Sequence, residues 1–241
     1  RSMSANANPD IVTDNLVLCL DAGDRKSYPG TGTTWTDRSG NANGTLINGP
    51  TFNSANSGSI VFDGSNDSVT HVYNSNFDMD TNGTIEVVFR CDSALTNSSD
   101  FRQTIWDNEP SGSLGLEIGA FSSCSINSTV GYRFLMHRQG NCFSAVSEAN
   151  AWTKSEICHF VYTRDGSRGE KMFVNGAEIT PQQTNGYTYS SGSSQCYLGI
   201  RQSTGGGQKL NGRIYKLGIY NKALTAAEVL QNFNATKSRF L

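Results

Sequence analysis

Residues 211–233 read NGRIYKLGIYNKALTAAEVLQNF, and this stretch decides the fold. Over residues 213–220, β-branched and aromatic residues alternate between two faces at period two, which predicts a strand. Asn221 ends the strand. Thr225 then begins a Thr-x-x-Glu capping box with Glu228, in which each side chain accepts a hydrogen bond from the other residue's backbone N–H. Apolar residues on one face of 224–233 predict a short helix that lies back on the body of the protein.

Upstream of this stretch, short apolar runs alternate with turn signals at spacings of roughly 8 to 15 residues. The predicted strands cover residues 16–20, 45–47, 59–62, 69–72, 84–90, 104–107, 114–118, 132–137, 157–163 and 195–200. Asn175-Gly176 predicts a tight hairpin turn between residues 172–174 and 177–179, because Asn and Gly tolerate the positive φ angles that a type I′ turn requires. The pattern predicts an all-β, two-sheet β-sandwich, with one domain over residues 15–241 and a polar, loosely held arm over residues 1–14.

The composition argues against two classes of partner. Of the 241 residues, 17% are charged, and the net charge is −2. Lys and Arg do not cluster anywhere, which argues against nucleic acid as a partner. No apolar run approaches the ~18 residues of a membrane span, so we expect no membrane insertion.

Six segments, in order along the chain, resemble a single family. Besides the closing stretch, they are residues 15–23 (NLVLCLDAG), 35–44 (WTDRSGNANG), 60–67 (IVFDGSND), 172–176 (MFVNG) and 197–200 (YLGI). This set resembles a laminin-G-like domain of the concanavalin A-like lectin type. The resemblance implies an antiparallel jelly-roll sandwich with one short C-terminal helix and a role in carbohydrate binding.

Two further segments, SYPGTGTTW at residues 27–35 and NATKSRF at residues 234–240, resemble lectin-like domains of bacteriophage tail fibres, neck appendages and other virion proteins. Arg1-Ser2 before Met3 resembles a cloning scar, and no apolar signal core follows Met3. The resemblance implies a location on the outer surface of a virion, after synthesis in the host cytoplasm without a signal peptide. The alternative is that the sequence is an excised fragment.

The related fold also occurs in glycoside hydrolases, so catalysis has to be considered. The concanavalin A-like hydrolases carry their paired carboxylates on one strand as Glu-x-Asp-x-x-Glu or a close variant, and this chain lacks that pattern. On the same strand face as Glu86, two residues away on either side, are Thr84 and Val88. The corresponding neighbours of Glu117 are Gly115 and Gly119. Both glutamates are interpreted as solvated strand residues, and the protein is predicted not to be an enzyme.

A structural calcium ion is the inorganic cofactor that the sequence suggests, with Asp21, Asp63 and Asp67 as ligands, because Ca²⁺ prefers carboxylate and carbonyl oxygens. The alternative is that Asp63 accepts a hydrogen bond from the backbone of its own turn. Tyr215 stands where the resembling family frequently has Asp, which weakens the calcium hypothesis.

The carbohydrate site is predicted in the middle of the chain, where an aromatic ring has polar neighbours of the kind that sugar hydroxyls require. The candidate residues are Trp106, Asp107, Asn108, Tyr132, Arg133, His137 and Arg138. Core packing is the alternative for Trp106. Trp152 and His159 are expected to be core residues.

The six cysteines show no Cys-x-x-Cys spacing, which argues against a zinc site. Cys19, Cys91, Cys158 and Cys196 lie in or beside predicted strands, where a free thiol acts as a small apolar residue. Cys124 and Cys142 flank the predicted strand at 132–137 and could form a local disulfide; the alternative is that both stay reduced.

Three functions are compatible with these sequence features. The first is a non-enzymatic, lectin-like adhesion module that binds a host-surface glycan or polysaccharide. The second is a structural decoration of a capsid, neck or tail that binds other virion proteins. The third is a polysaccharide-cleaving enzyme.

Overall fold

The computed structural model describes residues 9–79, 81–94, 100–108, 115–121, 132–138, 142–166, 169–184, 195–201 and 208–240. The strands are β1 (Leu16–Asp21), β2 (Thr34–Trp35), β3 (Gly44–Ile47), β4 (Thr51–Asn53), β5 (Ser59–Asp63), β6 (Ser68–Val72), β7 (Asn82–Cys91), β8 (Asp100–Asp107), β9 (Gly115–Phe121), β10 (Arg133–Arg138), β11 (Cys142–Ser147), β12 (Cys158–Asp165), β13 (Gly169–Val174), β14 (Ala177–Ile179), β15 (Pro181–Thr184), β16 (Gln195–Leu198) and β17 (Asn211–Tyr220). The helical elements are η1 (Ala55–Ser57), η2 (Ser75–Phe77), α1 (Ala226–Thr236) and η3 (Lys237–Arg239).

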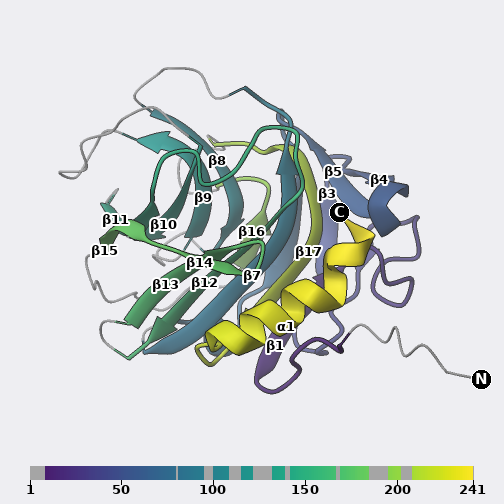
Figure 1. The fold of residues 1–241 in the computed structure, drawn as a ribbon. Helices are drawn as coiled ribbons and strands as arrows, with labels where there is room; N and C mark the ends of the chain where they lie inside the picture. The colour runs from purple at the N-terminus through teal and green to yellow at the C-terminus, as the bar shows by residue number, and fades with distance from the viewer. Residues whose placement is uncertain are drawn as a thin grey trace, which may run out of the picture.

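The strands form two antiparallel sheets that pack as layers (Figure 1). Neighbouring strands of the first sheet follow the order β14-β13-β12-β7-β17-β5-β4, and β1 also pairs with β17. The second sheet has the order β15-β11-β10-β9-β8-β16-β6-β3-β2. The predicted antiparallel two-sheet sandwich is confirmed.

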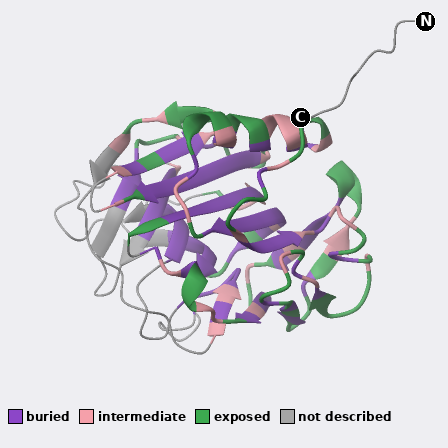
Figure 2. Ribbon diagram, turned by 90° about the horizontal axis from the view of Figure 1, so that it is seen from below, coloured by how far each residue is buried: buried purple, intermediate pink, exposed green. Residues whose placement is uncertain are grey.

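The core lies between the two sheets. Ile85, Val87 and Phe89 of β7 belong to the same apolar cluster as Leu116 and Ile118 of β9. Figure 2 shows that buried residues fill the strands, while exposed residues gather in the loops and on the outer side of α1. Because every second residue of these strands points inward, the alternating pattern of the sequence locates the core directly.

The predictions for single core residues can be checked where the structure describes them. Trp152 is buried and packs edge-on against Phe89, with ring centroids 5.8 Å apart, as predicted. The predicted burial of free thiols is confirmed for Cys19, Cys91, Cys158 and Cys196. Cys124 lies outside the described residues, so its disulfide with Cys142 stays a prediction.

The closing strand and helix form as predicted. The hydroxyl of Thr225 accepts a hydrogen bond from the Glu228 N–H at 3.3 Å, and the Glu228 carboxylate accepts one from the Thr225 N–H at 2.8 Å. Figure 1 shows α1 lying across the outer face of the first sheet. In the described ranges, no helix has the length and apolar character needed to cross a bilayer.

Four strands, β2, β4, β11 and β15, are not predicted by the sequence pattern. β2, β4 and β15 are edge strands of two to four residues, too short to show an alternation. β11 is an inner strand, but its register shifts against both neighbours, β10 and β15. These bulges interrupt the period-two pattern that marks a strand in the sequence.

The prediction of a loosely held arm is wrong for its last residues. Residues 1–8 lie outside the described part, but Val12 is buried, and its N–H donates to the side-chain oxygen of Asn232 at 2.7 Å. Lys222 donates to the Asp14 carboxylate at 2.8 Å. The lead-in is therefore fixed against α1, because Val12 completes a small apolar cluster beneath the helix.

Candidate functional site

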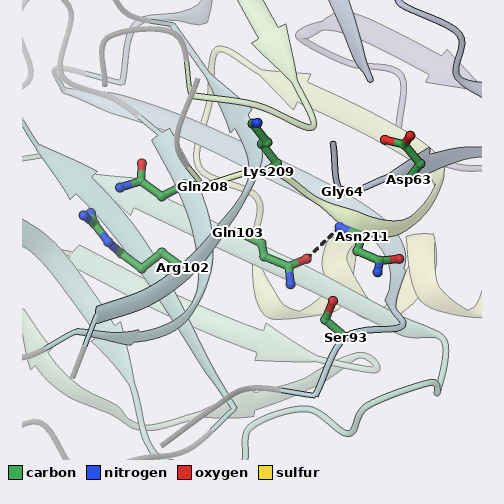
Figure 3. Close-up of a pocket in the computed structure, with 8 residues that line it drawn as sticks. All are labelled: Asp63, Gly64, Ser93, Arg102, Gln103, Gln208, Lys209 and Asn211. Atoms are coloured by element: carbon green, nitrogen blue, oxygen red, sulfur yellow. Dashed lines mark hydrogen bonds between the residues drawn. The ribbon is translucent and has the colours of Figure 1, made fainter. Parts of the chain in front are cut away.

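A pocket of about 480 Å³ opens at one rim of the sandwich, where β5 and β7 end and where β8 and β17 begin. We call it the rim pocket. It is lined by Asp63, Gly64, Ser93, Arg102, Gln103, Gln208, Lys209 and Asn211. Figure 3 shows Gln103 near the middle, with Asp63 and Gly64 on one side and Arg102 and Gln208 on the other. Apart from Gly64, every side chain that lines it is polar or charged.

The turn after β5 builds one wall of the rim pocket. Asp63 Oδ1 accepts a hydrogen bond from the Ser65 N–H at 2.7 Å, and Asp67 Oδ2 accepts one from the Asp63 N–H at 3.0 Å. Hydrogen bonds that the Asp63 carboxylate accepts from its own turn, that of the Ser65 N–H above all, lower the pKa of Asp63. Gly64 has a φ of 77°, and a Cβ there would lie 2.9 Å from the Asn211 Cβ, so glycine is needed at this wall.

The Gln103 side chain joins the two sheets behind the pocket. Its Oε1 accepts hydrogen bonds from the Asn211 N–H at 2.9 Å and from the Cys91 thiol at 3.5 Å (Figure 3 draws the first). The Thr104 N–H donates to the Gln208 carbonyl oxygen at 3.0 Å. These contacts tie β8 of the second sheet to the segment that enters β17 of the first, so both sheets hold the shape of the pocket.

Behind Arg102 lies a buried ion-pair cluster. Glu117 stands between the core residues Leu116 and Ile118, so its side chain points to the opposite face of the second sheet. Arg102 Nη1 donates to Glu117 Oε2 at 3.0 Å, and Arg201 Nη1 lies 3.6 Å from Oε1. Two guanidinium groups thus face one buried carboxylate. The interpretation of Glu117 as solvated is wrong.

A second polar cluster lies beneath α1, and we call Glu86, His159, Lys216, Tyr220 and Asn232 the covered cluster. Glu86 Oε1 lies 2.7 Å from His159 Nε2, and Oε2 accepts a hydrogen bond from the Asn232 amide at 3.0 Å. The Lys216 ammonium and the Tyr220 hydroxyl both lie 3.5 Å from Oε2.

Burial would raise the pKa of Glu86, but the charge of Lys216 and the hydrogen bond with His159 outweigh it and bring the pKa down to about 2. The Glu86 side chain is fully buried, so its interpretation as solvated is wrong. The prediction that His159 is a core residue is confirmed, with its Nε2 beside Glu86 and no hydrogen-bond partner for its Nδ1 among the described residues.

The prediction that Trp106 presents an exposed ring is wrong, and the core-packing alternative is confirmed. The indole is fully buried, and its Nε1 donates to His71 Nε2 at 3.0 Å. A register shift between Thr104 and Trp106 turns Ile105 and Trp106, although adjacent, both into the core. Asp107 and Asn108, two further predicted ligands, are buried as well.

The rest of the predicted sugar site is divided between two ends of β10. Asp107 of β8 and His137 of β10 both pair with Gly115 of β9, the strand between them. The side chains of His137 and Arg138 lie outside the described part. Arg133, at the other end, is buried and donates to the Ser147 carbonyl oxygen at 2.8 Å.

Tyr132 beside Arg133 packs edge-on against Trp152, with ring centroids 4.7 Å apart. The structure therefore does not bring the predicted residues together into one site.

The predicted calcium ligands have other partners. Both oxygens of Asp21 accept hydrogen bonds from Arg239, each at 2.7 Å. The alternative for Asp63, a hydrogen bond within its own turn, is confirmed. Within the described ranges, no group of three or more His, Cys, Asp and Glu side chains is placed to hold a metal ion. The calcium ion stays a prediction.

A second cavity, of about 250 Å³, lies at the opposite end of β5. It is lined by Ala22, Gly23, Arg25, Tyr28, Pro29, Phe52, Ser54 and Ser57. The rings of Tyr28 and Phe52 are tilted against each other, with centroids 5.5 Å apart. This cavity is smaller than the rim pocket, and apolar residues line part of it. A control variant can be placed there.

Sequence reasoning placed Asp63 in a candidate site and Asn211 at the start of the closing strand, but it missed Ser93, Gln103 and Lys209 as site residues. Ser93 and Lys209 lie within two residues of the end of a strand, whereas Gln103 lies in the middle of β8. The ends meet at one rim because β17 pairs with both β5 and β7, and the order of strands in a sheet is not visible in the local pattern.

Residues 63–230, more than half of the chain, match the sequence model described as the concanavalin A-like lectin/glucanases superfamily. No curated protein sequence matches the chain.

Solved structures with a similar fold include the botulinum neurotoxin serotype D binding domain, with 15% identity, a TM-score of 0.65 and a match over 91% of this chain and 51% of that one. The ligand binding domain of the same toxin in complex with N-acetylneuraminic acid matches over 91% and 50%, with 15% identity and a TM-score of 0.65. Trypanosoma rangeli sialidase in complex with sialic acid matches over 100% and 36%, with 16% identity and a TM-score of 0.64. The chain thus spans about half the length of the toxin domain and about a third of the sialidase. Identities this low show a shared fold alone.

Proposed function

This chain belongs to the concanavalin A-like lectin/glucanases superfamily, and from that premise we propose that it binds carbohydrate at the rim pocket without cleaving it. The observation that carries the proposal is the lining of the pocket, where hydroxyl, amide and charged side chains from both sheets surround about 480 Å³. Pockets that hold small ligands range from about 300 to 1,000 Å³. Sugar hydroxyls both donate and accept hydrogen bonds, so a mixed set of amide and hydroxyl groups suits them.

The positions of the acidic side chains favour binding over cleavage. Glycosidases place two carboxyl groups about 5 to 9.5 Å apart on either side of the scissile bond. Of the side chains described, Asp63 is the one carboxylate that lines the rim pocket, and the backbone of its own turn engages it. Glu86 and Glu117 are buried against cationic partners.

We extend the proposal to the setting implied by the narrower resemblance, a virion protein that adheres to a host-surface polysaccharide. One sugar pocket on an isolated domain binds weakly, and many copies on one particle raise the avidity by about 10² to 10⁴. The setting predicts that multivalent particles carrying this domain bind host cells. Tight binding to another virion component, with no binding to any glycan, would instead support a structural decoration.

A glycan array, followed by calorimetry with the glycan that it selects, tests the proposed site. Ser93→Tyr puts a large side chain into the rim pocket and is expected to lower the affinity about tenfold or more by excluding the ligand. Ser54→Tyr makes the same chemical change in the second cavity and is expected to leave the affinity unchanged.

The reverse result, with affinity lost in Ser54→Tyr and kept in Ser93→Tyr, would place the site in the second cavity and contradict the proposal. Release of new reducing ends from the bound glycan would contradict its non-catalytic part.

A further inference from the structure

Hydrogen bonds, rather than ring stacking, have to supply the specificity of the rim pocket. None of the described side chains that line it is aromatic, so the apolar face of a sugar ring meets no stacking platform there. Three of them, those of Gln103, Gln208 and Asn211, end in a primary amide, which donates through its nitrogen and accepts through its oxygen. Which of these atoms a ligand can use depends on what the protein itself already engages.

The Gln103 amide is held in one orientation. The Asn211 backbone N–H lies 2.9 Å from Oε1 and can only donate, so the atom that faces it has to be the amide oxygen. The Cys91 thiol lies 3.5 Å from the same oxygen. Gln103 is 2% exposed, so its surroundings leave the side chain little room to turn. The Nε2 group, at the other end of the amide, therefore keeps a fixed direction.

Gln103 Nε2 is a donor that the protein leaves available. It has no hydrogen-bond partner among the described residues, and Figure 3 shows it directed to the side of the pocket where Ser93 lies. The Cys91 thiol contacts both Gln103 Oε1, at 3.5 Å, and the Ser93 carbonyl oxygen, at 3.8 Å, so the two residues are neighbours. The Ser93 hydroxyl, which no described residue engages, is a second group that can donate into the same space.

The lysine of the lining adds to the same preference. Lys209 is exposed, has no ion-pair partner among the described side chains, and carries three donors but no acceptor. Figure 3 shows the Asp63 carboxylate on the other side of Asn211 from Ser93, and its own turn engages it. A ligand group beside Gln103 and Ser93 therefore meets donors, and a cationic group in the pocket is repelled by Lys209.

Given the proposed glycan site, we infer that the rim pocket selects N-acetylated amino sugars and that Gln103 is the residue that sets this specificity. The carbonyl oxygen of the acetamido group has two lone pairs and accepts from both Gln103 Nε2 and the Ser93 hydroxyl. Lys209 donates to another oxygen of the sugar. A hydroxyl group in place of the acetamido group also accepts, but its own hydrogen then needs an acceptor. The ammonium group of a free amino sugar carries only donors, so it leaves Gln103 Nε2 unpaired.

Calorimetry with sugars that differ only in the substituent at C2 tests this inference. One series consists of N-acetylchitotriose, cellotriose and chitotriose, which carry acetamido, hydroxyl and amino groups there. The methyl glycosides of N-acetylgalactosamine, galactose and galactosamine form a second series with the other configuration at C4. At about pH 6, where the free amines are protonated, the expected order of affinity in at least one series is acetamido, hydroxyl, ammonium. The first and the last are expected to differ about tenfold or more.

Gln103→Glu is the test variant, because it keeps an oxygen for the Asn211 N–H and replaces the donor by a negatively charged acceptor. This variant is expected to reverse the order, so that the ammonium sugar binds more tightly than the acetamido sugar. Gln231→Glu makes the same change at an exposed glutamine of α1 that does not line the pocket, and it is expected to leave the order unchanged.

Ser93→Ala supplies a second measurement in case Gln103→Glu does not fold, since Ser93 is less buried than Gln103. It removes the other donor beside the acetamido oxygen. The affinity for the acetamido sugar is expected to fall about threefold, while that for the ammonium sugar stays the same.

Equal affinities for the acetamido and ammonium sugars in both series, or no binding of either acetamido sugar, would overturn the selectivity while leaving the glycan site in place. An unchanged order in a folded Gln103→Glu variant would overturn the role of Gln103, and so would equal affinity changes for both sugars in Ser93→Ala. Full affinity of Ser93→Tyr for the glycan selected on the array would instead contradict the glycan site itself.

Discussion

The covered cluster and the rim pocket use the same kinds of side chain for different purposes. Beneath α1, both carboxylate oxygens of Glu86 have partners within 3.5 Å, and the helix shields them from water. At the rim, Lys209 is exposed, and Asn211 and Ser93 border an open cavity. Polar groups that are covered and paired stabilise this fold, whereas polar groups that face a cavity remain available to a ligand.

The largest effect that would test this contrast is expected at Glu86. Glu86→Gln removes the carboxylate that balances the buried charge of Lys216, and an uncompensated buried charge costs about 3–5 kcal/mol of unfolding free energy. Urea denaturation measures this loss. The matched control Glu156→Gln, at an exposed glutamate, is expected to change the unfolding free energy by less than about 0.5 kcal/mol. Similar losses of unfolding free energy in the two variants would contradict the stabilising role of the covered cluster.

The pH dependence of the unfolding free energy tests the contribution of the Glu86 carboxylate. The pKa of Glu86 falls from 4.5 to about 2 in the folded protein, so its contribution is fully present above about pH 4.5 and is lost as the pH falls through about 2. At ~1.4 kcal/mol per pKa unit, the expected loss is on the order of 3 kcal/mol. Acid titrations of the wild type and of Glu86→Gln are expected to converge near pH 2. A constant difference between them over this range would contradict the assignment to Glu86.

A smaller effect is expected at the start of the helix that covers the cluster. Thr225→Ala removes one half of the capping box and is expected to cost about 1 kcal/mol of unfolding free energy. Thr225→Ser keeps the hydroxyl and is expected to retain most of the stability. If both variants lose the same amount in urea denaturation, the hydrogen bond of the cap is not the cause.

The smallest effect on stability is expected in the rim pocket. Lys209→Gln alters an exposed side chain, so the unfolding free energy should change by less than about 0.5 kcal/mol, even though ligand affinity is expected to fall. Thermal unfolding without ligand measures the first quantity, and calorimetry measures the second. A loss of stability as large as that of Glu86→Gln would mean that Lys209 is a structural residue.

The parts of the fold that depend on neighbouring residues could be predicted from the sequence. The capping box of Thr225 and Glu228 joins residues three apart, and the alternation in residues 213–220 reflects one strand between two layers. Trp106 shows the limit of this reasoning. The polar residues after it suggested that its ring belongs to a sugar site, but a bulge in β8 turns the ring into the core, and a bulge leaves no local mark in the sequence.

The candidate site was harder to predict, because its residues come from chain segments that are far apart. Asp63, Ser93 and Lys209 meet only after β17 has paired with β5 and β7. Glu86 was misinterpreted for a related reason. Its neighbours on the strand say nothing about Lys216 on the next strand or Asn232 on the helix, which account for its burial.

Backbone amide shifts in NMR spectra, recorded while an isotopically labelled sample is titrated with the glycan selected on an array, test the central claim most directly. Binding at the rim pocket predicts that the largest shifts occur at Ser93, Gln103 and Lys209, with little change at Phe52 and Ser54. Shifts centred on Phe52 and Ser54, with the rim residues unchanged, would contradict the account.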